Sequence, residues 1–133
     1  MIGLGVSAIS DSWYAFAQNV KKVEDYQELV NKGELPVYRG HILTEEDLLI
    51  RKHILNLMCK LKTSWYTRGE FFKELPDVLF CLKEMQKDGL LEIDSNYLEI
   101  TEKGRPFVRN VCMAFDRRLQ RNKPQTQLFS MTV

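Results

Sequence analysis

The side chains that could carry chemistry in this 133-residue chain are few and far apart. Its three cysteines, Cys59, Cys81 and Cys112, are separated by 22 and 31 positions, which is neither a disulfide framework nor a zinc-ligand spacing. Each cysteine lies among apolar residues, so we expect three buried free thiols. His41 and His53 have no carboxylate or cysteine pattern beside them that would support a metal or general-base role. No catalytic constellation follows from residue types and spacing alone.

The opening segment contains a glycine pattern, Gly3-x-Gly5-x-x-Ala8, that matches the relaxed dinucleotide-binding fingerprint. That fingerprint requires a preceding strand, a following helix and an acidic residue ~20 positions further on. The segment 10–12 does not continue as an apolar-periodic helix, so a Rossmann site is not expected. Two interpretations stay open: a loop whose glycines let a ligand approach the backbone, or a purely structural turn.

The composition is that of a globular domain with no strong electrostatic preference. The 19 lysines and arginines nearly balance 18 aspartates and glutamates, so charge gives no reason to expect nucleic acid or an anionic membrane as a partner. No run approaches the ~20 apolar residues of a membrane span. The N-terminus also lacks the basic and then apolar pattern of a signal peptide. We therefore expect a cytoplasmic protein.

The first half of the chain is predicted to be helical with irregular connections. Residues 23–32 are predicted to form a short helix that Gly33 ends with a left-handed cap. We expect irregular aromatic packing in 11–19 and irregular extended chain in 35–43, which contains proline and glycine. Thr44 and the three acids after it predict the start of a long buried helix that ends near Lys62.

The second half is predicted to alternate helices with one hairpin. Thr67 and Glu70 match a capping box that opens a short helix, and Pro76 fits the first turn of the next. Alternating residues in 90–100 predict a β-hairpin, and Thr101 is predicted to cap a last helix. That helix presents Phe107, Val111 and Phe115 on one face. The chain is therefore predicted to be mainly α with a small antiparallel β-hairpin (α+β), with a winged-helix-like C-terminal half.

A winged-helix-like half raises the possibility of a free-standing binding module that reads nucleic acid. The segment 76–88, which would be the recognition helix, contains more acids than bases, and the hairpin tip at Asp94-Ser95-Asn96 has no base. Since binding to DNA requires cations that neutralise phosphates, we expect no specific duplex binding. A winged-helix binding module of another kind stays open as the alternative function.

Several stretches together resemble the C-terminal region of oxygen-independent coproporphyrinogen III oxidases (coproporphyrinogen dehydrogenases), a radical S-adenosylmethionine family. The resemblance covers nearly the whole chain and is strongest in the loop at 3–10 and in the run Val108 to Asp116. Between them it includes the segment 14–19, Arg39-Gly40, Leu43-Thr44, Asp47, Arg51, Leu57-Met58-Cys59, Asp88-Gly89-Leu90, Thr101 and Lys103-Gly104-Arg105.

The resemblance implies an enzyme that oxidatively decarboxylates coproporphyrinogen III to protoporphyrinogen IX without oxygen, in anaerobic haem biosynthesis. It implies S-adenosylmethionine and a [4Fe-4S] cluster held by three closely spaced cysteines in the full-length enzyme. Ser7, Ala8 and Ile9 match the family segment beside the active site, where the position of Ile9 contacts S-adenosylmethionine. The protein supplies positioning and shielding, because such cofactors carry the difficult chemistry.

The chain lacks the cysteine triplet of the family, so it is expected to be a C-terminal fragment that is inactive and free of cofactors on its own. Residues 1–20 are expected to be the end of the catalytic barrel with its active-site loop, and 21–133 a helical domain that covers the barrel. We expect a monomer. The segment 62–76 is shorter than in many relatives, and the end at 131–133 lacks a basic residue often found there.

Overall fold

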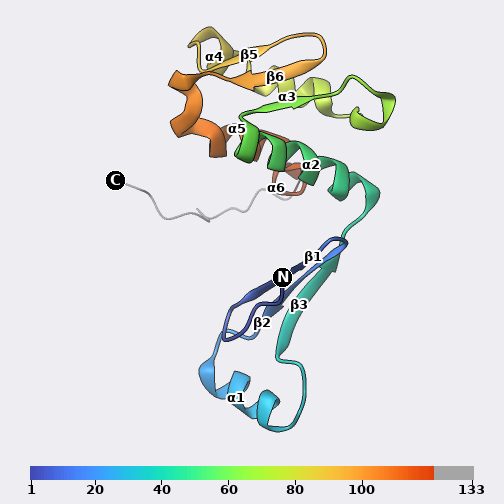
Figure 1. Cartoon of the computed structure of the whole chain (residues 1–133), viewed down its shortest axis with the longest axis vertical. Coiled ribbons are helices and arrows are strands. Elements are labelled where there is room, and N and C mark those ends of the chain that lie inside the picture. The colour runs from blue at the N-terminus through green and yellow to red at the C-terminus, as the bar shows by residue number, and fades with distance from the viewer. Residues whose placement is uncertain (122–133) are drawn as a thin grey trace. The chain divides into compact units, whose positions relative to one another are not determined.

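The computed structural model describes residues 1–121, in two compact units (Figure 1). The first unit spans Met1–Leu48 and the second begins at Leu49, so the division falls inside helix α2 (Glu45–Lys60). The resemblance implies a different boundary, at residue 20, between the end of the catalytic barrel and the helical domain. That boundary stays a prediction. The departure expected at 131–133 lies outside the described residues.

The first unit is built around a three-stranded antiparallel sheet in the order β1-β2-β3. Its elements are β1 (Ile9–Ser12), β2 (Ala15–Asn19), helix α1 (Val23–Asn31) and β3 (Val37–Ile42). β1 turns directly into β2, so that Ser12 lies opposite Ala15, and β2 pairs with β3 up to a bulge between Gln18 and Asn19. α1 ends as predicted at Gly33, whose φ of 73° is in the left-handed region that glycine favours.

This sheet corrects the prediction of irregular structure in 11–19 and 35–43. The strands are short, and one face carries small side chains, including Ala15, Ala17 and Gly40, so the alternation of apolar and polar residues is weak. Trp13 and Tyr14, which indicated aromatic packing, form the turn between the first two strands and are exposed. A Cβ on Gly40 inside β3 would lie 3.2 Å from the carbonyl oxygen of Phe16, a tight contact that glycine avoids.

The second unit combines helices with another three-stranded antiparallel sheet, in the order β4-β6-β5. After α2 come β4 (Lys62–Ser64), the 3₁₀ turn η1 (Arg68–Glu70), α3 (Leu75–Cys81), α4 (Lys83–Lys87), β5 (Leu91–Ile93), β6 (Tyr97–Ile100), η2 (Glu102–Phe107), α5 (Val108–Phe115) and α6 (Arg117–Arg121). The predicted hairpin is therefore present as β5 and β6. β4, which the sequence did not predict, extends it by pairing with β6.

The predicted helix starts are correct, but three of the helices are shorter than predicted. Thr44 Oγ1 accepts the amide of Asp47 at 3.2 Å, and Thr101 Oγ1 accepts that of Gly104 at 3.2 Å. The capping box at Thr67 opens only the single turn η1, because the chain leaves Phe71 in an extended conformation. The helix begun near Pro76 breaks at Leu82 into α3 and α4, and the last predicted helix divides into η2, α5 and α6.

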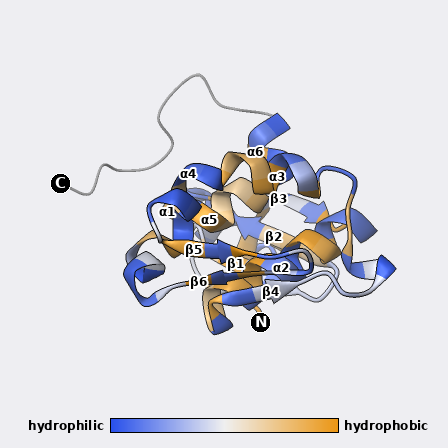
Figure 2. Ribbon diagram, turned by 90° about the horizontal axis from the view of Figure 1, so that it is seen from above, coloured by the Kyte–Doolittle hydropathy of each residue, from blue (hydrophilic) through white to orange (hydrophobic). Residues whose placement is uncertain are grey.

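The core of the structure lies in the second unit. Its buried apolar side chains come from α2, α3, the sheet strands, α5 and the segments between them: Ile50, Leu57, Trp65, Phe72, Leu75, Val78, Leu82, Leu91, Leu98, Ile100, Val111, Cys112 and Phe115. Figure 2 shows the contrast between the apolar stretch of α5 and the polar α4. Phe107, predicted to share the buried face of the last helix, is 43% exposed because it belongs to η2.

The cysteine prediction is wrong for two of the three thiols. Cys112 is buried, whereas Cys59 and Cys81 are exposed. Cys59 lies in the last turn of α2 and Cys81 in the last turn of α3, where each helix face turns away from the core. The apolar neighbours in sequence misled the prediction because they lie on a different face of the same helix.

The fold class is confirmed as α+β, with two small antiparallel sheets instead of one hairpin. The winged-helix assignment of the second unit stays a prediction. Among residues 1–121, no helix is long and apolar enough to cross a membrane.

Candidate ligand site

The loop that contains Ser7 and Ala8 is fixed by a buried amide. Asn19 is only 6% exposed, and its Nδ2 donates to the carbonyl oxygens of Gly5 at 2.9 Å and of Gly3 at 3.2 Å. The backbone of the loop pairs with β2 and the residue after it, because the Ser7 amide donates to Val20 at 2.8 Å and the Asn19 amide donates to Ala8 at 2.9 Å. The predicted site residues are therefore held in place from one side by the end of β2.

Both glycines of the opening pattern have a structural reason within the chain. A Cβ on Gly3 would lie 2.7 Å from the carbonyl oxygen of Ile9, and Gly5 has φ of 97°, where a side chain is strained. The pattern leads into the strand β1 and not into a helix, so it is not a dinucleotide-binding turn. Of the two interpretations left open, the structural turn suffices to explain the glycines.

One face of the β1-β2-β3 sheet carries two rows of larger side chains. The register places Ile9, Gln18 and Arg39 in one row across the three strands and Asp11, Phe16 and His41 in the next row. Alternate residues of a strand share a face, so both rows lie on the same side of the sheet. Ser10, Ala17 and Gly40 fall in a row on the opposite side.

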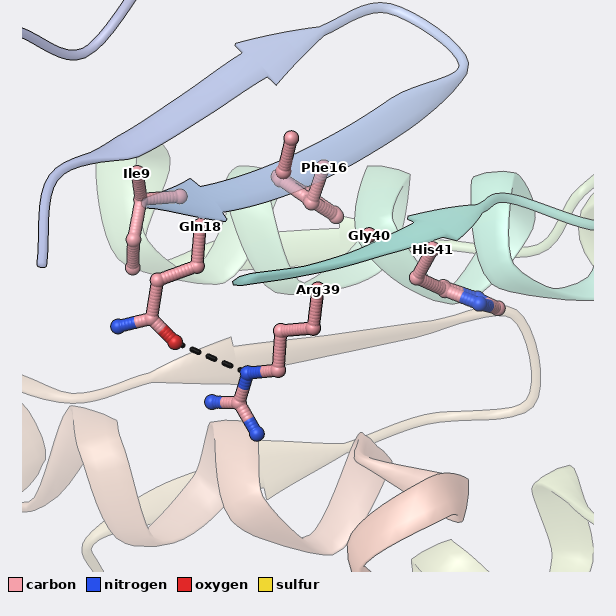
Figure 3. A pocket seen from close by; sticks show the side chains of 7 residues that line it. Ile9, Phe16, Gln18, Arg39, Gly40 and His41 are labelled. Atoms are coloured by element: carbon pink, nitrogen blue, oxygen red, sulfur yellow. Dashed lines mark hydrogen bonds between the residues drawn. The ribbon is translucent and has the colours of Figure 1, made fainter. Parts of the chain in front are cut away.

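A hollow of ≈ 420 Å³ lies along the sheet (Figure 3). Ile9, Phe16, Gln18, Arg39 and His41 line it from this face, and Ala17 and Gly40 of the intervening row also contribute to its lining. The predicted residue Ile9 is thus at the hollow, with a side chain that is 54% exposed and not part of a core. Ser7 and Ala8 do not line it. The sequence prediction missed the other lining side chains because they come from segments that it treated as irregular.

Gln18 joins the predicted loop to β3. Its Nε2 donates to the carbonyl oxygen of Ser7 at 3.3 Å, and its Oε1 accepts from Nε of Arg39 at 2.9 Å, the bond drawn in Figure 3. The two bonds fix which end of the amide faces which neighbour. The side chains of Ile9, Gln18 and Arg39 consequently lie next to each other along one row of the sheet.

His41 has a carboxylate partner that the sequence prediction did not recognise. Its Nε2 lies 3.1 Å from Oδ2 of Asp47, whose side chain is 10% exposed. The same oxygen accepts from the amide of Thr44 at 2.9 Å and from its hydroxyl at 2.8 Å. The signal was present in the sequence, since a helix-capping Thr-x-x-Asp follows directly on a strand that ends near His41. This arrangement holds the imidazole against the start of α2.

His53 belongs to the core of the second unit and not to this site. Its Nε2 lies 2.9 Å from the carbonyl oxygen of Glu70, which can only accept, so Nε2 carries the proton and Nδ1 accepts from the hydroxyl of Thr63 at 2.7 Å. Burial lowers the pKa of His53. A neutral imidazole with both nitrogens bonded is a structural group.

The described residues contain no group of three or more histidines, cysteines, aspartates or glutamates that could hold a metal ion. The thiol of Cys112 is a poor ligand, because burial raises its pKa to about 11 and its Sγ is oriented toward the carbonyl oxygen of Ile54, 3.9 Å away. Cys59 and Cys81 lie on different helices and are exposed. The expectation that this chain alone binds no cluster stays a prediction.

No protein-family model matches the chain. Over its whole length it is 33% identical to an oxygen-independent coproporphyrinogen III oxidase of Escherichia coli, and over 94% of its length it is 36% identical to that of Cereibacter sphaeroides. This chain matches the C-terminal region of oxygen-independent coproporphyrinogen III oxidases. It spans 30% of the length of the E. coli relative.

The fold agrees with this match. The solved structure of coproporphyrinogen III oxidase from E. coli, a radical S-adenosylmethionine enzyme, superposes with a TM-score of 0.78 at 32% sequence identity. The superposition covers 89% of this chain and 28% of that structure. The resemblance predicted from the loop at 3–10 and from the run Val108 to Asp116 is thereby confirmed, and the relatives are oxidoreductases.

Proposed function

We propose that this chain forms the C-terminal part of an oxygen-independent coproporphyrinogen III oxidase and is inactive alone. The observation that carries the proposal is the similarity along the entire chain to one continuous region of oxidases, at 33% identity. The protein that contains it converts coproporphyrinogen III to protoporphyrinogen IX by oxidative decarboxylation, in anaerobic haem biosynthesis. A free-standing winged-helix binding module is the weaker alternative, because the similarity covers both units of the chain.

The chemistry itself belongs to groups held elsewhere in such an enzyme. When bound in the full-length enzyme, S-adenosylmethionine and a [4Fe-4S] cluster would supply the radical chemistry at the propionate side chains. The described cysteines do not fit a cluster, since Cys59 and Cys81 are exposed on separate helices and Cys112 is buried with a raised pKa. The residues of this chain therefore serve to bind, to orient and to exclude water.

Within the first unit, the segment Ser7, Ala8 and Ile9 is the part that we assign to the S-adenosylmethionine site. Asn19 fixes the turn before it, and pairing with β2 fixes the strand that carries Ile9. The side chain of Ile9 is stiff because it is branched at Cβ, and it is exposed to a ligand. It would orient S-adenosylmethionine by its shape and would shield it from water, without supplying a reactive group.

We expect no nucleic-acid partner, a monomer and a cytoplasmic protein. The segment 76–88, which a winged-helix protein would use for DNA, contains three acids, Asp77, Glu84 and Asp88, against two lysines, Lys83 and Lys87. This balance provides no cationic surface to neutralise phosphates.

The experiment is a chimaera in which this chain replaces the C-terminal 30% of the E. coli oxidase. We expect the purified, cluster-loaded chimaera to convert coproporphyrinogen III under anaerobic conditions, and the isolated chain to convert none. Product is measured as oxidised porphyrin after chromatography. A folded chimaera with its cluster bound and with no turnover contradicts the proposal, as does a stoichiometric iron–sulfur cluster in the isolated chain.

A further inference from the structure

We infer that Arg39, positioned by Gln18, is the anchor for a ligand carboxylate at the hollow on the β1-β2-β3 sheet. The guanidinium uses Nε for its bond to Gln18 Oε1 at 2.9 Å. Its two terminal nitrogens have no hydrogen-bond or ion-pair partner among residues 1–121, and the residue is exposed. A planar fork of N–H donors is thereby presented from the face that carries Ile9.

The bond to Gln18 orients the fork. Gln18 makes a second bond, from Nε2 to the carbonyl oxygen of Ser7 at 3.3 Å, so its acceptor oxygen faces Arg39. An arginine held in this way has less rotamer freedom to lose when it binds an anion. Two parallel N–H···O bonds from a guanidinium to a carboxylate are among the stronger hydrogen-bonded pairs in proteins.

The surroundings favour a carboxylate attached to an apolar body. Ile9 and Phe16 line the hollow beside the two polar side chains. His41 is bonded to Asp47, and Asp11, on the same face, is not among the residues that line the hollow. Arg39 is therefore the fixed charge in the lining, and it is positive.

The register places the two groups that the ligand would contact. Ile9 and Arg39 are separated by one intervening strand, so their backbones lie roughly 10 Å apart, at about 4.8 Å per strand. A ligand that contacts both carries a carboxylate and an apolar group in separate parts of the molecule. The inference rests on the proposed function, in which two carboxylates meet this requirement: that of S-adenosylmethionine and a propionate of coproporphyrinogen III.

The test is a titration of the oxidase chimaera, prepared without its cluster, with three probes, followed by NMR of the Arg39 Nε–H and Gln18 amide resonances. The probes are S-adenosylmethionine, methylthioadenosine, which lacks the carboxylate, and coproporphyrin III, which carries four propionates. We expect at least one of the two carboxylate probes to bind and to shift both resonances. The Arg39→Met variant should bind the same probe at least tenfold more weakly. The probe whose affinity falls in Arg39→Met identifies the source of the carboxylate. Methylthioadenosine has no carboxylate, so its affinity should be the same for the parent and the variant.

Two further variants separate recognition from folding. Gln18→Glu places a competing carboxylate next to Arg39 and should weaken binding as Arg39→Met does, whereas Arg39→Lys, which keeps the charge and loses the fork, should have an intermediate effect. Gln27→Glu on α1 makes the same charge change at an exposed position of the same unit and should leave binding unchanged.

The inference is overturned if neither carboxylate probe binds at millimolar concentration, or if the Arg39 variants bind as tightly as the parent chain. It is also overturned if Gln27→Glu is as harmful as Gln18→Glu. Because the titration involves no turnover, these outcomes are independent of whether the oxidase chimaera is active.

Discussion

The two units of this protein are stabilised in different ways. The second unit buries apolar side chains from α2, α3, the β4-β6-β5 sheet and α5, including Leu57, Leu98 and Phe115, none of which is exposed at all. In the first unit the one residue classed as buried is the polar Asn19, and large apolar side chains such as Leu35 (85%) and Ile42 (80%) are exposed. The second unit is thus stabilised by its own apolar core, whereas the first unit is a sheet held together mainly by backbone hydrogen bonds.

The difference agrees with a chain that spans 30% of its relative's length. Exposed apolar surface of this extent is typical of an interface with further protein. We therefore expect the second unit to dominate the stability of the chain. Under the proposed function, the first unit would gain its full rigidity from the remainder of the oxidase.

The largest expected effect is on the core of the second unit. Phe115→Ala removes a ring that contacts His53 and Phe72, and it should lower the free energy of unfolding by about 3–5 kcal/mol. Phe80→Ala is the matched control, because Phe80 is 69% exposed, and it should cost no more than about 0.5 kcal/mol. Urea denaturation measures both, and equal losses would contradict the assignment of the core.

A smaller effect is expected in the first unit, at its buried amide. Asn19→Ala leaves the carbonyl oxygens of Gly3 and Gly5 without their donor, at a cost of roughly 1–3 kcal/mol to the local structure. Faster hydrogen exchange at the Ser7 amide, which donates to Val20, would report this opening. The exposed Asn31→Ala should leave that exchange rate unchanged. Protection that survives Asn19→Ala would show that the loop is held by other contacts.

The third effect depends on pH and acts on the second unit. Since burial lowers the pKa of His53, the unfolded chain protonates this residue at a higher pH, near 6.5, than the folded chain does. As the pH falls through 6.5, the unfolded state binds more protons and the stability decreases; above 6.5 both states are neutral and the effect vanishes. His53→Gln should flatten the decrease in unfolding free energy between about pH 7.5 and about pH 5.5. Urea denaturation across this pH range is the measurement, and an unchanged slope in His53→Gln would refute the assignment to His53.

The sequence predicted the second unit better than the first for a physical reason. The long helical face of Ile50, Ile54 and Leu57 and the caps at Thr44 and Thr101 are local signals, and each appears where it was expected. In the first unit, β3 pairs with a segment some 20 residues away, such as Arg39 with Gln18, and short strands with small residues give little periodicity. β4 was missed because its pairing is also distant in sequence: Thr63 lies opposite Leu98.

The candidate site shows the same division. The resemblance indicated Ser7, Ala8 and Ile9, and the structure places Ile9 at a hollow. Gln18, Arg39 and His41 were not assigned to the site, because their relation to Ile9 exists only once the sheet is formed. Asp47 was assigned to the start of a helix, where it lies, but its bond to His41 depends on the end of β3.

The substitution Ile9→Asp should have the smallest effect on stability, and it tests the proposed role of this chain most directly. Ile9 is 54% exposed, so Ile9→Asp in the oxidase chimaera should change the free energy of unfolding by no more than about 0.5 kcal/mol. Turnover of coproporphyrinogen III should nevertheless be lost, because a carboxylate replaces the stiff apolar surface that orients S-adenosylmethionine, while Ile9→Val should retain most of it. The measurement is anaerobic turnover beside thermal unfolding of the same samples. Lost turnover with an unchanged melting temperature is the predicted result; full turnover, or a loss that only follows the fraction of unfolded protein, would contradict the assignment.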